Sequence, residues 1–261
     1  MKNFIDLTNI DRKHLTNIIS EARIVKSSRK SMFSGAFDED KSLENVVVAL
    51  IFQKPSTRTR FSFEVGVRQM GGTTIFVSGT DLHMNKGEEI SDTAEVLSRY
   101  VDMIVIRASN EKIVLDIANN STVPVINALT NSSHPCQIMA DIMTYEEKRG
   151  SIRGKKVVWF GDGNNVCQSF LDASAKFDFN FVFCGPRALK PKKVNRNLNQ
   201  SCGSYLIEAD PKKAIEGADL VVTDTWVSMH DTANEYTKKK TLLEPYQVNM
   251  DLLQKAPSEC F

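Results

Sequence analysis

Apolar runs alternate with amphipathic stretches along almost the whole chain, and this alternation limits the possible folds most strongly. Runs without polar interruptions predict buried strands, which occur in parallel sheets that are covered by helices on both faces. The sequence therefore predicts an α/β fold with two doubly wound parallel-sheet domains joined by a helix. One of the intervening helices is predicted over 90–101, with Ser91 as its N-cap. The expected strands are 46–52, 73–78, 102–108 and 123–128 in the first series, and 155–161, 179–184, 204–209 and 219–226 in the second.

The two series of strands indicate two domains. We expect the first domain over residues 1–130 and the second over 131–261. One helical pattern begins with HPCQ at His134 and joins the two domains. It should end before Gly150, because glycine readily adopts the left-handed conformation that follows many helices.

Composition and charge limit the classes of partner. The formal net charge of +1 gives no general attraction to nucleic acid or to an anionic membrane. No apolar stretch is long enough to cross a bilayer, and the first residues do not form a secretory signal. The five cysteines form no CxxC pair, which favours reduced thiols over a disulfide framework or a zinc site. We therefore expect a cytoplasmic protein with no bound metal and with no nucleic acid or membrane as a partner.

A polar cluster follows the first apolar run. Ser56, Thr57, Arg58 and Thr59 stand where the expected strand turns into a helix. A helix N-terminus offers unpaired N–H groups and the positive end of a dipole, which suit an anion. The hydroxyls add donors, and the planar guanidinium of Arg58 matches phosphate oxygens. The cluster predicts a phosphate site without a Walker lysine, and its alternative is a helix cap with a solvated basic start.

Two further features suggest groups that act on a carbonyl oxygen. His134 and Gln137 stand about one turn apart at the start of the joining helix, and both side chains can hydrogen-bond a carbonyl. Arg107 ends an apolar strand, where its charge can point into a ligand site at the carboxyl edge of the sheet. For a lone histidine, a capping or interior role remains the alternative.

The second series of strands carries two candidate motifs. FGDGNN at 160–165 imitates a dinucleotide-binding turn, but Val166 stands where the third glycine belongs, so the motif does not favour NAD. The asparagines of this turn, Asn164 and Asn165, could instead hold a substrate carboxylate. DTWVSM at 224–229 could bind an ammonium group through Asp224 with help from Ser228; the alternative is a simple strand-end turn.

STRTR, HPCQ, GDGNN and DTWVSM occur here in the order and context typical of one enzyme family. The chain resembles the transcarbamoylases, and among them the ornithine carbamoyltransferases. STRTR with HPxQ is shared by the whole superfamily, whereas the cysteine of HPCQ and the DTWVSM segment point to ornithine. An aspartate-type transcarbamoylase remains an alternative that DTWVSM disfavours.

The resemblance implies a carbamoyl-phosphate domain followed by an amino-acid domain. It assigns the phosphate to Ser56, Thr57, Arg58 and Thr59, and the carbamoyl oxygen to Arg107, His134 and Gln137. It assigns the ornithine α-carboxylate to Asn165 and the backbone at Met229, and the α-amino group to Asp224 and Ser228. Of these residues, it implies a catalytic role for Arg58, Arg107, His134 and Gln137.

The implied reaction is attack by the neutral δ-amine of L-ornithine on carbamoyl phosphate, which gives L-citrulline and phosphate. Because carbamoyl phosphate is already activated, the protein has to supply positioning and oxyanion stabilisation, without a metal or organic cofactor. The resemblance also implies a homotrimer with active sites between domains and between subunits, and a place in arginine biosynthesis or in ornithine and citrulline metabolism.

The sequence departs from the family pattern at two places. His83 stands where the family usually has a glutamine that reaches a neighbouring subunit's phosphate site, so the charge at this position would depend on pH. The sequence ends at Phe261, before the HCLP segment and closing helix of the family. The expectation that follows is a truncated chain that binds carbamoyl phosphate and makes little citrulline, and the alternative function is that of a non-catalytic binder.

Overall fold

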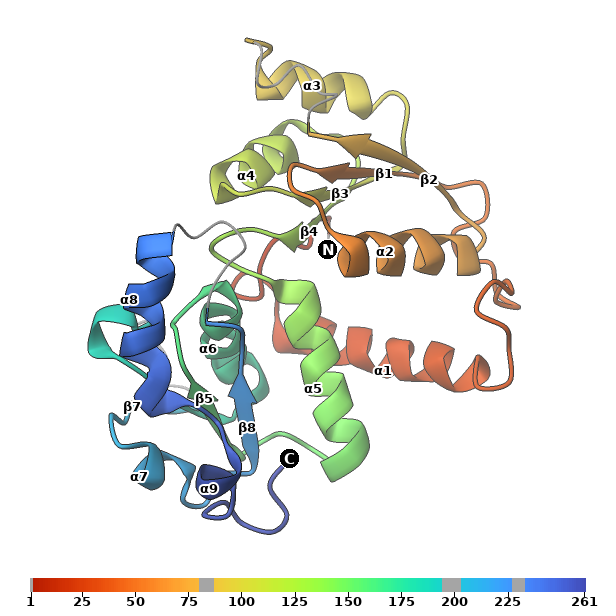
Figure 1. Cartoon of the computed structure of the whole chain (residues 1–261). Helices are drawn as coiled ribbons and strands as arrows, with labels where there is room; N and C mark the ends of the chain where they lie inside the picture. The colour runs from red at the N-terminus through yellow and green to blue at the C-terminus, as the bar shows by residue number, and fades with distance from the viewer. Residues whose placement is uncertain (1, 80–86, 194–202, 227–232) are drawn as a thin grey trace. The chain divides into compact units, whose positions relative to one another are not determined.

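The computed structural model describes residues 2–79, 87–193, 203–226 and 233–261. The chain divides into two compact units, Met1–Met139 and Ala140–Phe261. In chain order, the helices and strands are α1 (Arg12–Ser28), β1 (Val47–Phe52), α2 (Thr57–Gln69), β2 (Thr73–Ser78), α3 (Ile90–Leu97), β3 (Met103–Arg107), α4 (Glu111–Asn120), β4 (Val125–Leu129), α5 (Pro135–Arg149), β5 (Lys156–Phe160), α6 (Asn165–Phe177), β6 (Asn180–Cys184), β7 (Tyr205–Ile207), α7 (Pro211–Ile215), β8 (Leu220–Thr223), α8 (Ala233–Leu243) and α9 (Met250–Leu253) (Figure 1).

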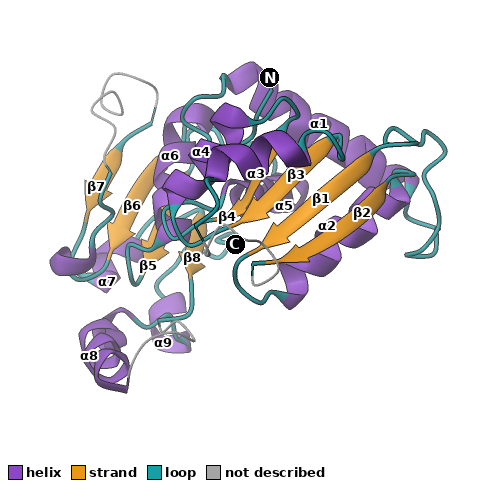
Figure 2. Ribbon diagram, turned by 90° about the horizontal axis from the view of Figure 1, so that it is seen from above, coloured by secondary structure: helices purple, strands orange, loops and turns teal. Residues whose placement is uncertain are grey.

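The first unit contains a parallel sheet with the strand order β2-β1-β3-β4. Figure 2 shows the strands of each sheet as parallel arrows. After β1 the chain moves to one side to form β2, and then crosses β1 to form β3 and β4. The switch point of this sheet therefore lies between the carboxyl ends of β1 and β3, where open α/β sheets bind their ligands.

The two faces of this sheet are covered by different helices. Alternate residues of β1 point to opposite faces, so Ala49 and Ile51 pack with residues of α3 and α4, while Val48, Leu50 and Phe52 pack with α2. Figure 1 shows α3 and α4 on one side of the sheet and α2 on the other. Burial on both faces explains why β1 reads as an uninterrupted apolar run.

The second unit repeats this design with the strand order β7-β6-β5-β8, again with parallel pairing. On one face, Phe170 of α6 packs against Trp159 and Phe181. On the other face, residues of α7 and α9 pack against Val158 and Phe160. Since β5 lies between β6 and β8, the switch point of this sheet lies between the carboxyl ends of β5 and β8.

The prediction of two parallel α/β domains joined by a helix is confirmed, because the division between the units falls within α5. That helix ends at Arg149, and Gly150 follows in the left-handed conformation with φ +79°.

Two details of the prediction are wrong. The strand at 73–78 forms as expected but is not buried: β2 is an edge strand, and Ile75 is 47% exposed. Ile75 pairs with Ala49 on the face that α3 and α4 cover, but it lies at the margin of that cover. The helix predicted over 90–101 ends at Leu97, and its N-cap is Glu89, so Ser91 lies inside the first turn.

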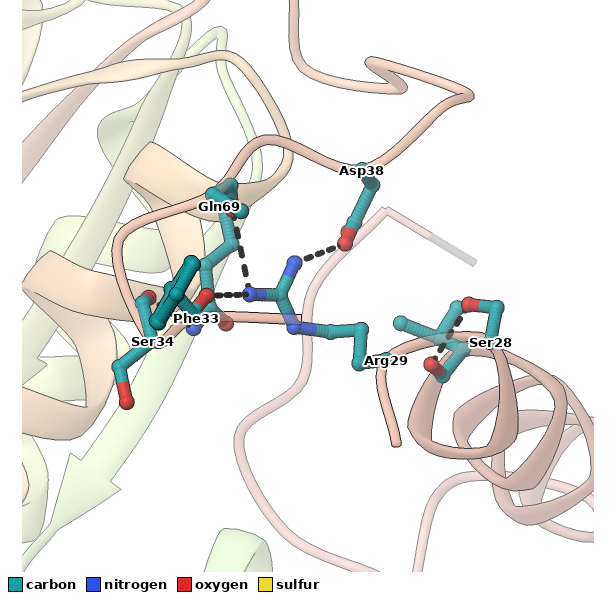
Figure 3. A network of polar contacts seen from close by, with 8 residues as sticks. Ser28, Arg29, Phe33, Ser34, Asp38 and Gln69 are labelled. Atoms are coloured by element: carbon teal, nitrogen blue, oxygen red, sulfur yellow. Dashed lines mark hydrogen bonds and ion pairs between the residues drawn. The ribbon is translucent and has the colours of Figure 1, made fainter. Parts of the chain in front are cut away.

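A partly buried ion pair fixes the connection between α1 and β1 (Figure 3). Arg29 pairs with Asp38, and their side chains are only 14% and 11% exposed. The guanidinium also donates a 3.1 Å hydrogen bond to the carbonyl of Ala36, and Gln69 donates one of 2.7 Å to the carbonyl of Ser34. These contacts tie the connection to the C-terminal end of α2, whose N-terminal end carries the predicted phosphate cluster.

Within the described residues, no helix is long and apolar enough to cross a membrane. Four of the five cysteines fall in the described ranges, and all four are free thiols: Cys136, Cys167, Cys184 and Cys260.

Candidate functional site

The first candidate site begins where β1 passes into α2. Ser56 is the N-cap residue of α2, with extended backbone (φ −157°, ψ 115°), but its side chain caps no backbone N–H. Its hydroxyl instead accepts a 2.9 Å hydrogen bond from Nη1 of Arg107. The same Nη1 donates to the Thr59 hydroxyl, also at 2.9 Å. Two residues of the polar cluster are thus joined to the last residue of β3, across the switch point of the sheet.

Arg107 is a half-buried cation at the end of β3. In the part of the chain that the structure describes, no carboxylate pairs with its guanidinium, and its buried Nε has no hydrogen-bond partner. Burial lowers the pKa of Arg107, because desolvation disfavours the charged form. A desolvated guanidinium with unused N–H groups is a strong site for an anion.

The two other residues of the cluster lie in the first turn of α2. Thr57 and Arg58 are exposed, and neither pairs with another residue in the described ranges. Their polar groups and the unpaired backbone N–H groups of this turn are therefore available to a ligand.

His134 and Gln137 lie at the carboxyl end of β4, the strand next to β3. Pro135 is the first residue of α5, so His134 directly precedes the helix and Gln137 lies exposed in its first turn. Arg107, at the end of β3, and His134 and Gln137, after β4, thus lie at the carboxyl ends of neighbouring strands. Cys136 stands between His134 and Gln137, and burial raises the pKa of its thiol to about 12, which favours the neutral thiol over the nucleophilic thiolate.

The second candidate site lies at the switch point of the second sheet. Asn164 is the N-cap of α6, and its Oδ1 accepts hydrogen bonds of 3.0 Å from the backbone N–H groups of Val166 and Cys167. Its Nδ2 donates to Oδ2 of Asp224 at 2.9 Å. Asp224 follows β8 and is exposed, so its carboxylate stands at the carboxyl edge of the sheet beside the start of α6.

The sequence prediction gave Asn164 and Asn165 a shared role, but the structure separates them. Both hydrogen-bonding atoms of the Asn164 side chain are engaged within the protein. Asn165 is the first residue of α6 and is half-buried. Three other predicted site residues, His83, Ser228 and Met229, lie outside the described residues.

The two units match two parts of one family. The model for the carbamoyl-P binding domain of aspartate/ornithine carbamoyltransferase matches residues 2–147, and the model for the Asp/Orn binding domain matches residues 153–261. The chain belongs to the aspartate/ornithine carbamoyltransferase family. The resemblance found in the four sequence motifs is thereby confirmed.

Several ornithine carbamoyltransferases are similar to this family member over almost its whole length. The enzyme of Cereibacter sphaeroides strain KD131 is 54% identical over 257 residues, which cover 98% of this chain and 83% of that protein. The enzyme of Paracoccus denitrificans is 52% identical with the same coverage. The solved structure of ornithine carbamoyltransferase from Pyrococcus furiosus is 39% identical with a TM-score of 0.92, covering 100% of this chain and 83% of that one.

Sequence reasoning missed the polar residues that hold the site of this family member in place. Asn127 is fully buried in β4 and donates a 3.0 Å hydrogen bond to Ser133 Oγ, while the Ser133 N–H donates to Thr130 Oγ1 at 3.0 Å. These bonds fix the loop that leads to His134. A single asparagine within the apolar run VINAL was the available signal, since a buried polar side chain needs a partner.

Proposed function

We propose that this protein transfers the carbamoyl group of carbamoyl phosphate to the δ-amine of L-ornithine, giving L-citrulline and phosphate. Membership of the family and the similarity to ornithine carbamoyltransferases support this reaction. The structural observation that carries it is the half-buried Arg107 guanidinium at the switch point of the first sheet, which has no counter-charge among the described residues.

In this proposal the first unit binds carbamoyl phosphate. Ser56, Thr57, Arg58 and Thr59 would hold the phosphate with their side chains and with the N-terminal backbone of α2. Arg107, His134 and Gln137 would hold and polarise the carbamoyl oxygen, on which negative charge develops as the amine attacks. Groups fixed at the edge of the sheet can stabilise that charge without reorganising, which is the main contribution the reaction needs.

The second unit would bind ornithine. Asp224 would pair with the α-ammonium group together with Ser228, while Asn165 and the backbone at Met229 would bind the α-carboxylate. This arrangement leaves the δ-amine unbound by these groups, and as a neutral amine it can attack the carbamoyl carbon. Loss of phosphate then yields citrulline, so phosphate itself is the leaving group and needs no covalent intermediate on the protein.

The assembly and setting form part of the same proposal. We infer a cytoplasmic homotrimer that serves arginine biosynthesis or ornithine and citrulline metabolism, with His83 directed to a neighbouring subunit's phosphate site. Large exposed apolar side chains support association between copies of the chain: Phe61 on α2, Ile75 on β2, Val96 on α3 and Tyr100 just after α3. Light scattering coupled to size exclusion would show a monomer if this part of the proposal is wrong.

Replacing Arg58 by lysine should weaken binding of carbamoyl phosphate by roughly 10- to 100-fold, because the charge remains but the two-pronged contact is lost. Isothermal titration of the purified chain with carbamoyl phosphate measures the effect. Arg99→Lys, at an exposed arginine elsewhere in the same unit, is the matched control and should bind like the unchanged chain. Equal affinity of Arg58→Lys and the unchanged chain would remove Arg58 from the site.

Replacing Asp224 by asparagine should reduce the affinity for norvaline, an ornithine analogue without the δ-amine, by roughly 10-fold or more. The asparagine keeps the size of the side chain but cannot pair with the α-ammonium group as an ion. The titration is carried out with carbamoyl phosphate at saturation. If aspartate or succinate binds to the unchanged chain in place of norvaline, the aspartate-type alternative is correct.

A citrulline assay tests the reaction itself. The purified chain with carbamoyl phosphate and ornithine should form citrulline faster than the same mixture without protein, and Asp224→Asn should lower this rate. A chain that binds carbamoyl phosphate but forms no citrulline above the background would instead be the non-catalytic binder of the alternative function.

A further inference from the structure

We infer that Asn164 is a positioning residue: its side-chain amide orients the Asp224 carboxylate for the substrate's ammonium group, and it does not itself bind substrate. The inference rests on the proposed role of Asp224. It rests on one hydrogen bond, from Asn164 Nδ2 to Asp224 Oδ2 at 2.9 Å. This bond joins the N-cap residue of α6 to the residue that directly follows β8.

The Asn164 side chain connects two different structures. Its Oδ1 accepts from two backbone N–H groups at the start of α6, which fixes the plane of the amide. The Nδ2 group is then directed at Asp224. Serine or aspartate could supply the capping oxygen equally well. An ionised aspartate has no donor, however, and serine carries its only donor on the capping oxygen itself, without the separate NH₂ group of asparagine. Asparagine satisfies both demands with one side chain.

The carboxylate of Asp224 is held from two directions. Its Oδ1 accepts a 2.7 Å hydrogen bond from the backbone N–H of Thr225, and its Oδ2 accepts the bond from Asn164. An exposed aspartate would otherwise sample several rotamers, and ordering it on binding would cost free energy. With both oxygens held, the carboxylate keeps one orientation and still has lone pairs for an ammonium group.

The turn that carries Asn164 is itself held firmly. Trp159 Nε1 donates to the carbonyl of Asp162 at 2.9 Å. The N–H of Gly163 donates to the carbonyl of Leu189 at 2.7 Å. A side chain at residue 163 would collide with the backbone of residues 189–191. The turn can therefore lie this close to that segment only because residue 163 is glycine. Asn164 therefore offers its amide from a fixed position.

A double-mutant cycle tests whether Asn164 acts through Asp224. Norvaline affinity is measured with saturating carbamoyl phosphate for the unchanged chain, Asn164→Ser, Asp224→Asn and the double variant. Serine keeps the cap of α6 but removes the amide Nδ2 that donates to Asp224. We expect Asn164→Ser to lose about tenfold in norvaline affinity, and the double variant to bind no more weakly than Asp224→Asn alone.

The controls separate positioning from stability. Asn110→Ser makes the same exchange at the N-cap of α4, where the asparagine accepts from Lys112 N–H, and it should leave norvaline affinity unchanged. Asn164→Ser should also retain its affinity for carbamoyl phosphate and its melting temperature.

The outcomes distinguish this inference from the proposed function. If the unchanged chain binds norvaline and Asn164→Ser binds it equally well, or if the two substitutions are additive, Asn164 does not orient Asp224 and the inference is wrong. If the unchanged chain does not bind norvaline at all, the proposed ornithine site fails and the inference fails with it.

Discussion

Replacing Arg107 by methionine is expected to abolish binding of carbamoyl phosphate and, at the same time, to stabilise the unliganded chain. The two effects have one cause. The Arg107 guanidinium is partly desolvated, and within the described residues only two hydroxyl groups accept hydrogen bonds from it. In the unliganded state the desolvated charge lowers the stability of the fold. In the complex the same charge is the main group that attracts the anionic ligand.

The binding loss should be large because several interactions disappear together. Each hydrogen bond from a guanidinium to a charged or polarised oxygen contributes about 1.5–3 kcal/mol, and Arg107 has more than one unused N–H group. We therefore expect a loss of at least about 100-fold in affinity. Methionine fills similar space without a charge, so the unfolding free energy should rise, as it often does when buried ionic groups are replaced by apolar ones.

Isothermal titration and thermal unfolding of the same preparation measure the two effects. Arg99→Met repeats the chemical change at an exposed arginine of the same unit, and should alter neither the affinity nor the melting temperature appreciably. Carbamoyl-phosphate affinity within threefold of the unchanged chain would exclude Arg107 from the site. A lower melting temperature together with lost binding would mean that Arg107 stabilises the fold, and that its charge does not destabilise the unliganded chain.

The fold could be predicted from the sequence because most strands are largely apolar runs and the end of the joining helix has a recognisable glycine. The run VVALIF of β1 is buried on both faces, and Gly150 ends α5 as expected. The prediction was wrong where the neighbours in space decide the outcome. Ile75 is as apolar as the residues of β1, but it lies on an edge strand, and no local pattern reveals which strand will be at the edge.

For the candidate sites, the sequence indicated which residues stand at strand ends but not how they pair. Arg107 and Ser56 are 51 residues apart, and Asn164 and Asp224 are 60 apart. Both contacts arise because the strand order brings β1 beside β3 and β5 beside β8. A motif read alone therefore gave Asn164 the role of a ligand, whereas its position across from Asp224 indicates that it holds another side chain.

Replacing Gly185 by alanine is expected to destabilise the chain by about 3 kcal/mol and to weaken norvaline binding, because the added methyl group meets backbone atoms. Gly185 follows β6 directly, and Gly161 follows β5 directly, so the two glycines face each other just beyond the last paired residues, Phe160 and Cys184. The Gly161 N–H donates a 3.0 Å hydrogen bond to the Cys184 carbonyl, which draws the two segments together.

A methyl group has no room at this contact. A Cβ at residue 185 would lie 2.7 Å from Cζ of Phe183 and closer still to the carbonyl oxygen of Gly161, within the 3.0 Å that real Cβ contacts essentially never show. Because the Gly161 carbonyl is backbone, no side-chain rotation can relieve the clash. The turn that leads to Asn164 must move away from β6, and the amide that meets Asp224 must move with it.

Chemical unfolding and norvaline titration of Gly185→Ala measure these two effects, and carbamoyl-phosphate affinity should change little because its site belongs to the other unit. Gly66→Ala is the matched control: Gly66 lies inside α2 with no atom within 4 Å of an added Cβ, so alanine should stabilise the chain by about 0.5–1 kcal/mol. If Gly185→Ala were as stable as the unchanged chain and bound norvaline equally well, the contact between these two turns would not set the position of Asn164, and the start of α6 would have to be held by its remaining hydrogen bonds alone.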